Sequence, residues 1–327
     1  MNKETHIPEA VVNRAEPVKN KICFSFLYEV RFGNPNGDPD YSNHPRLDPS
    51  SETAYTTDVC QKRKIRNYVE KYYAGQPGMA IYVKEGVPLN VTDQKICQAS
   101  LGIDPLGKDS FTTAFNNKVK AFPDDEVPAD WALSKRDYLS NQLLSQYVRE
   151  FFDIRAFGQV LASYSGAHIA ADHVKGPVVL HYPTSVHSVE IVRNAVSRCT
   201  VTRVNENKDT DFGSKFVVPY ALFRCNGTIE PPLATVTGFS EDDLQKLFEA
   251  IEYMHETDVS AARPNQLFRG LYIWRFDTPR GGHINHAFDS LVIKPLASAP
   301  RSIKDFEITC KEPDPDSHMT LETRLNF

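Results

Sequence analysis

The sequence lacks the features that mark membrane, secreted or zinc-binding proteins. Its six cysteines are scattered over 327 residues without a Cys-x-x-Cys pair, which excludes the usual zinc ribbons and gives no disulfide framework. No apolar run is long enough to span a membrane, and the polar first 20 residues are not a signal peptide. A basic excess is also missing, since the net charge is −5. We therefore expect a cytoplasmic protein, in which any nucleic-acid surface is a local basic patch on an acidic body.

The stretch from residue 21 to residue 73 carries the clearest local signals. Over residues 22–30 large apolar side chains recur at every second position, which is the period of a half-buried strand. Glycine and proline are so dense over residues 31–49 that this segment forms neither a helix nor a central strand. A helix is expected next, because its apolar and its basic residues fall on different faces: Ile65, Tyr68, Val69 and Tyr72 against Lys62, Arg63 and Arg66.

The start of that helix has two interpretations. Its free amide groups, the hydroxyl of Thr57 and the basic side chains one turn on suit a phosphate backbone. A capped amphipathic helix with a solvated basic face would give the same pattern. The spacing alone leaves both interpretations open.

The remainder of the chain completes an α+β pattern. Turn signals interrupt residues 74–140, which is typical of an insertion. Helical periodicity then returns from residue 139 to residue 157, and a capping-box variant at residues 240–243 opens another helix. Strands are expected at residues 174–182, 215–224 and 270–276. Without the insertions the order is βαββαβ, the ferredoxin-like arrangement that RNA-recognition modules also use.

Three linked blocks resemble the opening of a known family: GNPNGDPD at residues 33–40, PRLDP at 45–49 and TDVCQKRKIRNYV at 57–69. The family is the Cascade backbone subunit, the seventh family of CRISPR-associated proteins, in its type I-C form within the RAMP superfamily. The resemblance continues in FFDIRAFG (151–158), VKGPV (174–178), VVPYAL (217–222) and SAAR (260–263), and covers roughly residues 21–293.

The resemblance implies a modified RRM-like fold shaped like a hand. A palm would span residues 21–299, with a finger insertion at about 74–140 and a thumb hairpin at about 186–215. A polar leader (1–20) would precede the palm, and a peripheral tail (300–327) would follow it.

The same resemblance implies a subunit that is not an enzyme and needs no cofactor. It would bind the guide RNA (crRNA), stack head to tail with further copies along the spacer, and present the guide in segments to the target DNA strand. Other implied partners are the Cascade cap subunit, the large PAM-reading subunit and the recruited helicase-nuclease, and no membrane is implied.

Candidate RNA-binding residues lie in four places along the chain. The loop and first helix contribute most of them, and the family's matching Lys and Arg positions contact phosphates: Arg31, Asn34, Asn36, Arg46, Thr57, Lys62, Arg63 and Arg66. Arg155, Phe157 and Gln159 would stack on or beside a base, although a packed helix end would have the same sequence. His173 and Lys175 lie at the mouth of a strand, and Arg263 belongs to a family-like motif that a structural ion pair would explain equally well.

Two alternative functions are weighed against this one. Type III relatives cut RNA with a loop aspartate, and Asp38 and Asp40 lie in a loop after the first strand, although Asp beside Pro and Gly commonly stabilises turns. A metal-dependent hydrolase would rest on the histidines at 168, 173, 181 and 187, whose spacings match no standard ligand pattern. We therefore expect no catalytic and no metal-binding residue.

Overall fold

A computed structural model describes residues 16–104, 110–129, 131, 133–161, 164, 173–198 and 211–326. Three long antiparallel strands form its centre, with β1 (Ile22–Gly33) between β10 (Asp211–Ile229) and β11 (Gln266–Phe276). On the β10 side lie β7 (Val178–Leu180), β8 (Thr184–Ser188) and β4 (Thr53–Tyr55), and on the β11 side lies β14 (Met319–Leu325).

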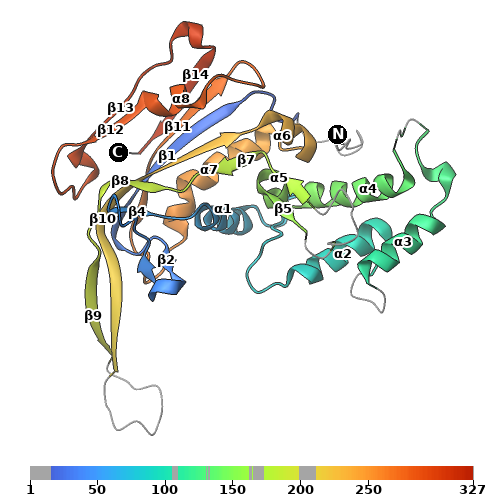
Figure 1. The fold of residues 1–327 in the computed structure, drawn as a ribbon, viewed down its shortest axis with the longest axis horizontal. Helices are drawn as coiled ribbons and strands as arrows, with labels where there is room; N and C mark the ends of the chain where they lie inside the picture. The colour runs from blue at the N-terminus through green and yellow to red at the C-terminus, as the bar shows by residue number, and fades with distance from the viewer. Residues whose placement is uncertain are drawn as a thin grey trace.

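Two helices, α1 (Asp58–Tyr73) and α7 (Glu241–Thr257), pack together against this sheet (Figure 1). The chain order is therefore β1, α1, β7 with β8, β10, α7 and β11. The predicted α+β class with an antiparallel sheet is confirmed. The predicted capping box of α7 is confirmed too, because Ser240 and Asp243 each accept a hydrogen bond from the other's backbone amide.

Strand β1 is buried on both faces, contrary to the half-buried strand that its periodicity predicts. Phe24, Phe26 and Tyr28 pack in the core beneath the two helices. Cys23 and Leu27 pack on the other face in a second core. That second core includes residues of α8 (Ile284–Ser290), β12 (Leu291–Pro295) and β13 (Phe306–Cys310). A ligand therefore reaches the ends of β1 rather than its middle.

A helical lobe lies beside the sheet, at the right of Figure 1. It contains α2 (Leu89–Leu101), α3 (Phe111–Ala121), α4 (Lys135–Glu150) and α5 (Phe152–Phe157), which share a core of their own. The predicted finger insertion, residues 74–140, forms much of this lobe, and α4 carries it beyond residue 140.

A two-stranded ribbon projects from the sheet (Figure 1). It consists of β9 (Val192–Arg198) and the first part of β10, paired from Val192↔Val217 to Arg198↔Asp211. Most of its described side chains are exposed, and a two-stranded ribbon has no core of its own. The ribbon overlaps the predicted thumb (about 186–215) and extends to Val217, and residues 199–210 of the predicted thumb lie outside the described residues.

The remaining elements are short. The strand predicted at residues 174–182 is divided into β6 (His173–Lys175) and β7, because Pro177 lacks an amide hydrogen for strand pairing. The others are β2 (Gly37–Asp38), β3 (His44–Pro45), β5 (Gly158–Val160), α6 (Pro231–Thr237) and 3₁₀ turns at Pro39–Tyr41, Asp124–Glu126, Ile303–Asp305 and Pro315–Ser317.

Both ends of the described chain are attached to the folded body. Of the predicted leader, residues 1–15 lie outside the described residues, whereas Val18 is buried and its amide donates to Phe239 O at 3.0 Å. The predicted peripheral tail contains β13 and also β14, which forms the outermost strand beside β11. Among the described residues, no helix has the length and apolar character needed to cross a membrane.

Candidate nucleic-acid interface

The loop between β1 and α1 is fixed by asparagine side chains. Asn34 Nδ2 donates to Asn43 O at 2.6 Å. Asn36 Oδ1 accepts from the Thr57 amide at 3.0 Å and from the Thr57 hydroxyl at 3.2 Å. Thr57 is the N-cap of α1, because its Oγ1 accepts from the Cys60 amide at 3.1 Å. The two predicted asparagines and Thr57 therefore position the helix start relative to β1.

Arg46 and Asp38 hold the far side of this loop. Arg46 Nη1 lies 2.9 Å from Asp38 Oδ2, and Asp38 Oδ1 accepts from the Asp40 amide at 3.1 Å. Asp38 thus caps the 3₁₀ turn that follows it, while Asp40 is exposed. This is the turn role that the sequence allows for Asp38 beside glycine and proline.

The basic residues of α1 differ in how far they reach the surface. Lys62 Nζ pairs with Asp58 Oδ2 at 2.9 Å, and both side chains remain partly exposed. Arg63 also lies at the surface, where it pairs with Glu85 and donates to Asn67 Oδ1 at 2.9 Å. Arg66 is only 8% exposed, in contrast to the open basic face that the spacing suggests.

Arg66 is covered because it anchors the helical lobe. Its Nε lies 2.8 Å from Asp153 Oδ2, and the buried Asp153 carboxylate also accepts from the amides of Tyr82 at 2.8 Å and Val83 at 3.1 Å. The Arg66 side chain therefore joins α1 to two segments of the lobe.

Phe157 brings separate parts of the predicted site together. Lys62 Nζ lies 5.7 Å and Arg66 Cζ 5.4 Å from the centroid of its ring. Both distances are within the range of cation–π contacts. Residues that are about 90 positions apart in the sequence thus form one basic and aromatic cluster.

Arg155 lies elsewhere than the sequence suggests. It is 1% exposed, and its Nε and Nη2 bind the Asp243 carboxylate at 3.0 Å and 2.7 Å. It also donates to Val148 O at 2.9 Å and to Gly78 O at 2.8 Å. The Nε, Nη1 and Nη2 groups are thus bonded in the interior, and because the side chain is buried a base cannot stack on Arg155 in this conformation.

A close backbone crossing sets the position of Lys175. Gly158, with φ +71°, pairs with Lys175, and a Cβ atom on Gly176 would lie 2.3 Å from the Gly158 nitrogen. Only glycine fits at this crossing. Lys175 therefore emerges directly beside the end of α5, which carries Phe157. It is exposed and forms no ion pair with any described residue.

Two further candidates are at the margin of this cluster. Gln159 is partly exposed, and its Nε2 donates to Val160 O at 3.2 Å. His173 is exposed on β6, two residues before Lys175.

Arg31 and Arg263 pair with acids at the end of β1. Arg31 Nη2 lies 2.8 Å from Glu29 Oε1, and the buried Glu29 also binds Arg269 at 2.6 Å. Burial and the Glu29 carboxylate raise the pKa of Tyr220, whose hydroxyl donates to Glu29 Oε2 at 3.1 Å.

Arg263 Nε lies 2.9 Å from Asp258 Oδ2, and Asp258 also pairs with Lys64. The ion pair offered as the structural explanation of Arg263 is therefore present, with its side chain 33% exposed.

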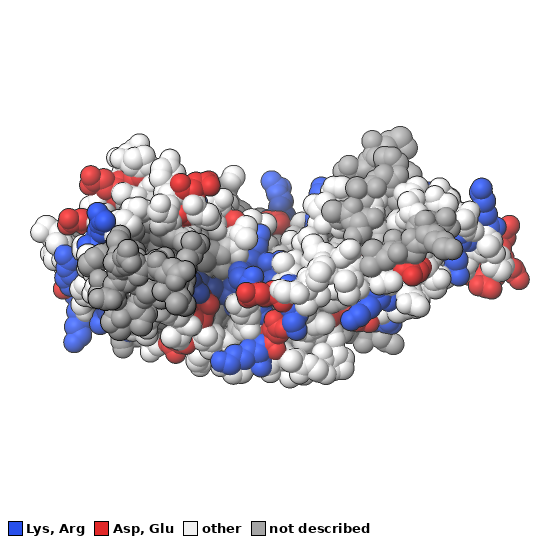
Figure 2. Space-filling view, turned by 90° about the horizontal axis from the view of Figure 1, so that it is seen from below, with Lys and Arg blue, Asp and Glu red and all other residues white. Residues whose placement is uncertain are grey.

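The surface charges agree with a local basic region. Figure 2 shows Lys and Arg side chains gathered near the middle of one face, at the horizontal position of α1 in Figure 1. Among the described residues no group of three or more His, Cys, Asp or Glu side chains is placed to hold a metal ion.

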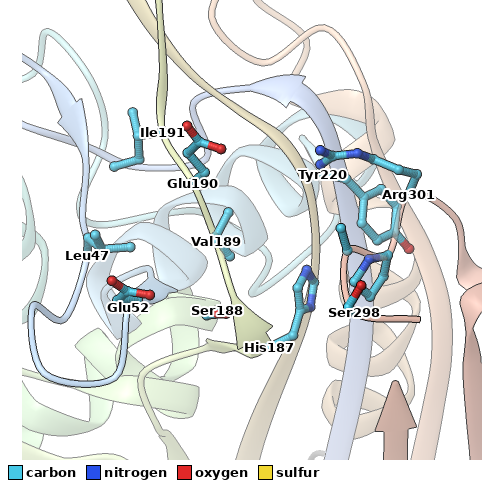
Figure 3. Close-up of a pocket in the computed structure, with 12 residues that line it drawn as sticks. Leu47, Glu52, His187, Ser188, Val189, Glu190, Ile191, Tyr220, Ser298 and Arg301 are labelled. Atoms are coloured by element: carbon cyan, nitrogen blue, oxygen red, sulfur yellow. The ribbon is translucent and has the colours of Figure 1, made fainter. Parts of the chain in front are cut away.

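A cavity of about 500 Å³ at the base of the ribbon is a feature that the sequence did not suggest. In Figure 3 Glu52 and Glu190 lie on one side of it, and His187 and Arg301 lie on the other. Burial, together with the charge of Arg301, lowers the pKa of His187. The cavity lining comes from four separate segments, so no local motif announces it.

Comparison with known proteins identifies the family. Residues 20–311 match the family described as CRISPR-associated protein Cas7. A protein of Haloferax volcanii, also described as CRISPR-associated protein Cas7, is 35% identical over 83 residues, which are 25% of this chain and 23% of that protein. The chain thus spans about a quarter of the length of the curated relative that it matches.

Three solved structures are also similar. A chain of a CRISPR RNA-guided surveillance complex in a pre-nicking state has a TM-score of 0.47 at 16% identity, covering 82% of this chain and 81% of that one. A chain of another such surveillance complex has a TM-score of 0.42 at 13% identity, with 83% and 74% covered. A chain of a type III-B Cmr-beta complex bound to cognate target RNA has a TM-score of 0.40 at 9% identity, with 78% and 61% covered. Because the family match extends over most of the sequence, this chain belongs to the Cas7 family of CRISPR-associated proteins.

Proposed function

We propose that this chain is a guide-RNA-binding backbone subunit of a type I CRISPR interference complex in the cytoplasm, of the type I-C form that its sequence blocks resemble. The observation that carries the proposal is the cluster in which Lys62 and Arg66 lie over the Phe157 ring, with the exposed Lys175 on the strand that pairs with Gly158, the residue after Phe157. Proteins that bind single-stranded nucleic acid without sequence preference combine basic surfaces with aromatic rings in this way. Membership of the Cas7 family makes the guide RNA the expected ligand.

The cluster suits a ligand of any sequence. Lys62 and Lys175 offer ammonium groups, which bind phosphates as point charges and do not read base edges. The start of α1 adds the positive end of the helix dipole, which also favours anions. The base edges of the guide would stay free, so that pairing with the target DNA strand supplies the specificity.

Assembly follows from the same proposal. Several copies would stack head to tail along the spacer, and the projecting β9–β10 ribbon would contact the neighbouring copy and divide the guide into segments. The Cascade cap subunit, the large PAM-reading subunit and a recruited helicase-nuclease would be the other partners.

The proposed subunit binds RNA without cutting it. Asp38, one of two aspartates that would serve a type III-like nuclease, is engaged by Arg46 and by the Asp40 amide. A carboxylate held in this way supports the loop and is less available to a metal ion. This favours a binding role over a hydrolytic one.

The test mixes purified protein with labelled RNA of arbitrary sequence, with and without Mg²⁺, and follows complex size together with RNA length. We expect intact RNA inside an assembly whose size grows with the length of the RNA. Mg²⁺-dependent cutting that disappears in Asp38→Ala or Asp40→Ala would overturn the proposal in favour of a nuclease. RNA binding that is confined to one sequence would also contradict it.

A further inference from the structure

Phe32 combines two unfavourable features at the end of β1. The alternation that buries Phe24, Phe26, Tyr28 and Val30 in one core would place Phe32 next on the same face. Instead, Phe32 has a φ of +46° and is 69% exposed. A positive φ is strained for a bulky residue, and an exposed aromatic ring forgoes the stabilisation of burial. Among the described residues the Phe32 ring makes no aromatic or cation–π contact that would offset its exposure.

The strained backbone is held from both sides. On one side the Arg31 amide donates to Asn265 O at 3.0 Å, and the Asn34 amide donates to Ala262 O at 2.7 Å. On the other side Arg31 and Gly33 pair with β10. Strain of this kind persists where the surroundings determine it, and it gathers at sites that bind ligands. The fold therefore fixes Phe32 in an exposed position.

The charges around Phe32 indicate what kind of ligand covers it. Arg31 precedes it with 36% of its side chain exposed, and Arg263 lies on the segment that contacts Gly33, with 33% exposed. Their acidic partners are less accessible, since Glu29 is fully buried and Asp258 is 17% exposed. Two partly exposed arginines are therefore found close to Phe32, one adjacent to it in the chain and one on the segment that packs against Gly33. An apolar protein partner would have to remove both from water, whereas a nucleic-acid strand offers a base for the ring and phosphates for the arginines.

We propose that Phe32 is a base-stacking residue for the bound RNA strand, with Arg31 and Arg263 binding the phosphates on either side. This inference rests on the proposed RNA-binding function and extends its interface from the Phe157 cluster to the end of β1. Asn34 and Asn36 connect the two places, because they hold the loop that joins Phe32 to the start of α1.

The test compares binding of arbitrary-sequence RNA with binding of an abasic strand that keeps the sugar-phosphate backbone. Phe32→Ala and Phe32→Leu should each weaken binding of the normal RNA by about 5- to 150-fold, the value of one stacked base. Phe32→Trp should bind like the unaltered chain. On the abasic strand all four proteins should bind equally, because only phosphates remain. Tyr253→Ala is the matched control, since Tyr253 is also a half-exposed aromatic residue but lines a groove with Glu249 and Glu252.

Other results would overturn the inference. If Phe32→Ala binds normal RNA like the unaltered chain, Phe32 does not stack, although the proposed function stands. If Phe32→Leu retains affinity, or if the loss is equal on the abasic strand, the residue makes an apolar contact with another protein surface. If the unaltered chain binds no RNA, both the inference and the proposed function fail.

Phe32→Gly gives an independent measurement. It removes the ring as alanine does, but glycine accepts a positive φ without strain. We expect Phe32→Gly to bind RNA as weakly as Phe32→Ala and to unfold at a higher temperature. A lower unfolding temperature than that of Phe32→Ala would contradict the strain at this position.

Discussion

Replacing Arg155 by alanine separates a structural role from an RNA-binding one. The side chain is 1% exposed and uses Nε, Nη1 and Nη2 to bind the Asp243 carboxylate and two backbone carbonyl oxygens. In Arg155→Ala the Asp243 carboxylate would stay buried without its cation. The structure therefore predicts a loss of stability without a direct loss of RNA contacts.

The size of the loss follows from these contacts. Breaking a buried ion pair by removing one partner costs about 3–5 kcal/mol. Asp243 keeps the Ser240 amide and hydroxyl as partners, which lowers the cost, while the orphaned carbonyl groups of Val148 and Gly78 raise it. We expect about 4 kcal/mol, which for a chain of 327 residues lowers Tm by roughly 6 °C.

Thermal unfolding and RNA binding should be measured on the same samples. Below its own Tm, Arg155→Ala should bind RNA with unchanged affinity and an unchanged salt dependence. Arg155→Lys keeps the charge but loses the bidentate geometry, so its Tm should lie between those of the unaltered chain and Arg155→Ala. A variant that loses RNA affinity at an unchanged Tm would refute the structural role and restore base stacking at Arg155.

Three other changes address the basic cluster, the core and the backbone crossing. Lys175→Ala should weaken binding of every RNA sequence and reduce the slope of log affinity against log salt by about 1, with an unchanged Tm. Lys71→Ala, at the far end of α1, should leave RNA affinity and its salt slope unchanged. His255 is fully buried with no hydrogen bond to its ring among the described residues, and burial holds its pKa well below the usual value. As the pH falls, the His255 ring is therefore protonated in the unfolded chain before it is protonated in the folded one. The free energy of unfolding should then fall by up to about 1.4 kcal/mol per pH unit below pH ~6.5, and in urea titrations His255→Phe should lack this share of the pH dependence. Gly176→Ala should lower Tm and RNA affinity together, because its Cβ meets backbone atoms, while Gly213→Ala, whose Cβ meets nothing within 4 Å, should leave Tm unchanged.

Local signals were sufficient for the elements that make up the sheet and its two helices. α1 and α7 each have an apolar stripe and a side-chain cap within a few residues, so their sequences specify them without tertiary information. The helical lobe was less accessible to sequence reasoning. Its core joins residues from Tyr82 to Val174. In α2 the buried stripe includes Asp93, and α3 repeats Phe111, Phe115 and Val119 at helical spacing over only 11 residues. Their burial depends on partners that lie far away in the chain.

The candidate site was predictable in its location and less so in the exposure of its members. The spacing placed Lys62, Arg63 and Arg66 on one face, but it carries no information about Asp153, which lies 87 residues beyond Arg66 and covers it. The same applies to Arg155, whose partner Asp243 is 88 residues away. An arginine that binds phosphate and one that closes an interior ion pair have the same local sequence. Phe32 was missed because only the backbone conformation reveals its strain.

Acidic neighbours explain how a chain of net charge −5 presents a basic site, and they lead to a last prediction. Lys62 is the more accessible of the two cations over Phe157, the other being Arg66. Asp58 lies one helical turn before Lys62, and its Oδ2 forms an ion pair with Lys62 Nζ at 2.9 Å. Asp58→Asn frees this ammonium group for phosphate, so RNA affinity at low salt should rise by about 3-fold or more. Because Asp58 also favours the helix N-terminus, the variant should lose about 0.3–1 kcal/mol of stability. Asp242→Asn is the matched control, since Asp242 pairs with Lys246 at the same spacing at the start of α7. An equal rise in RNA affinity in both variants would show that net charge governs binding, and no rise in either would remove Lys62 from the interface.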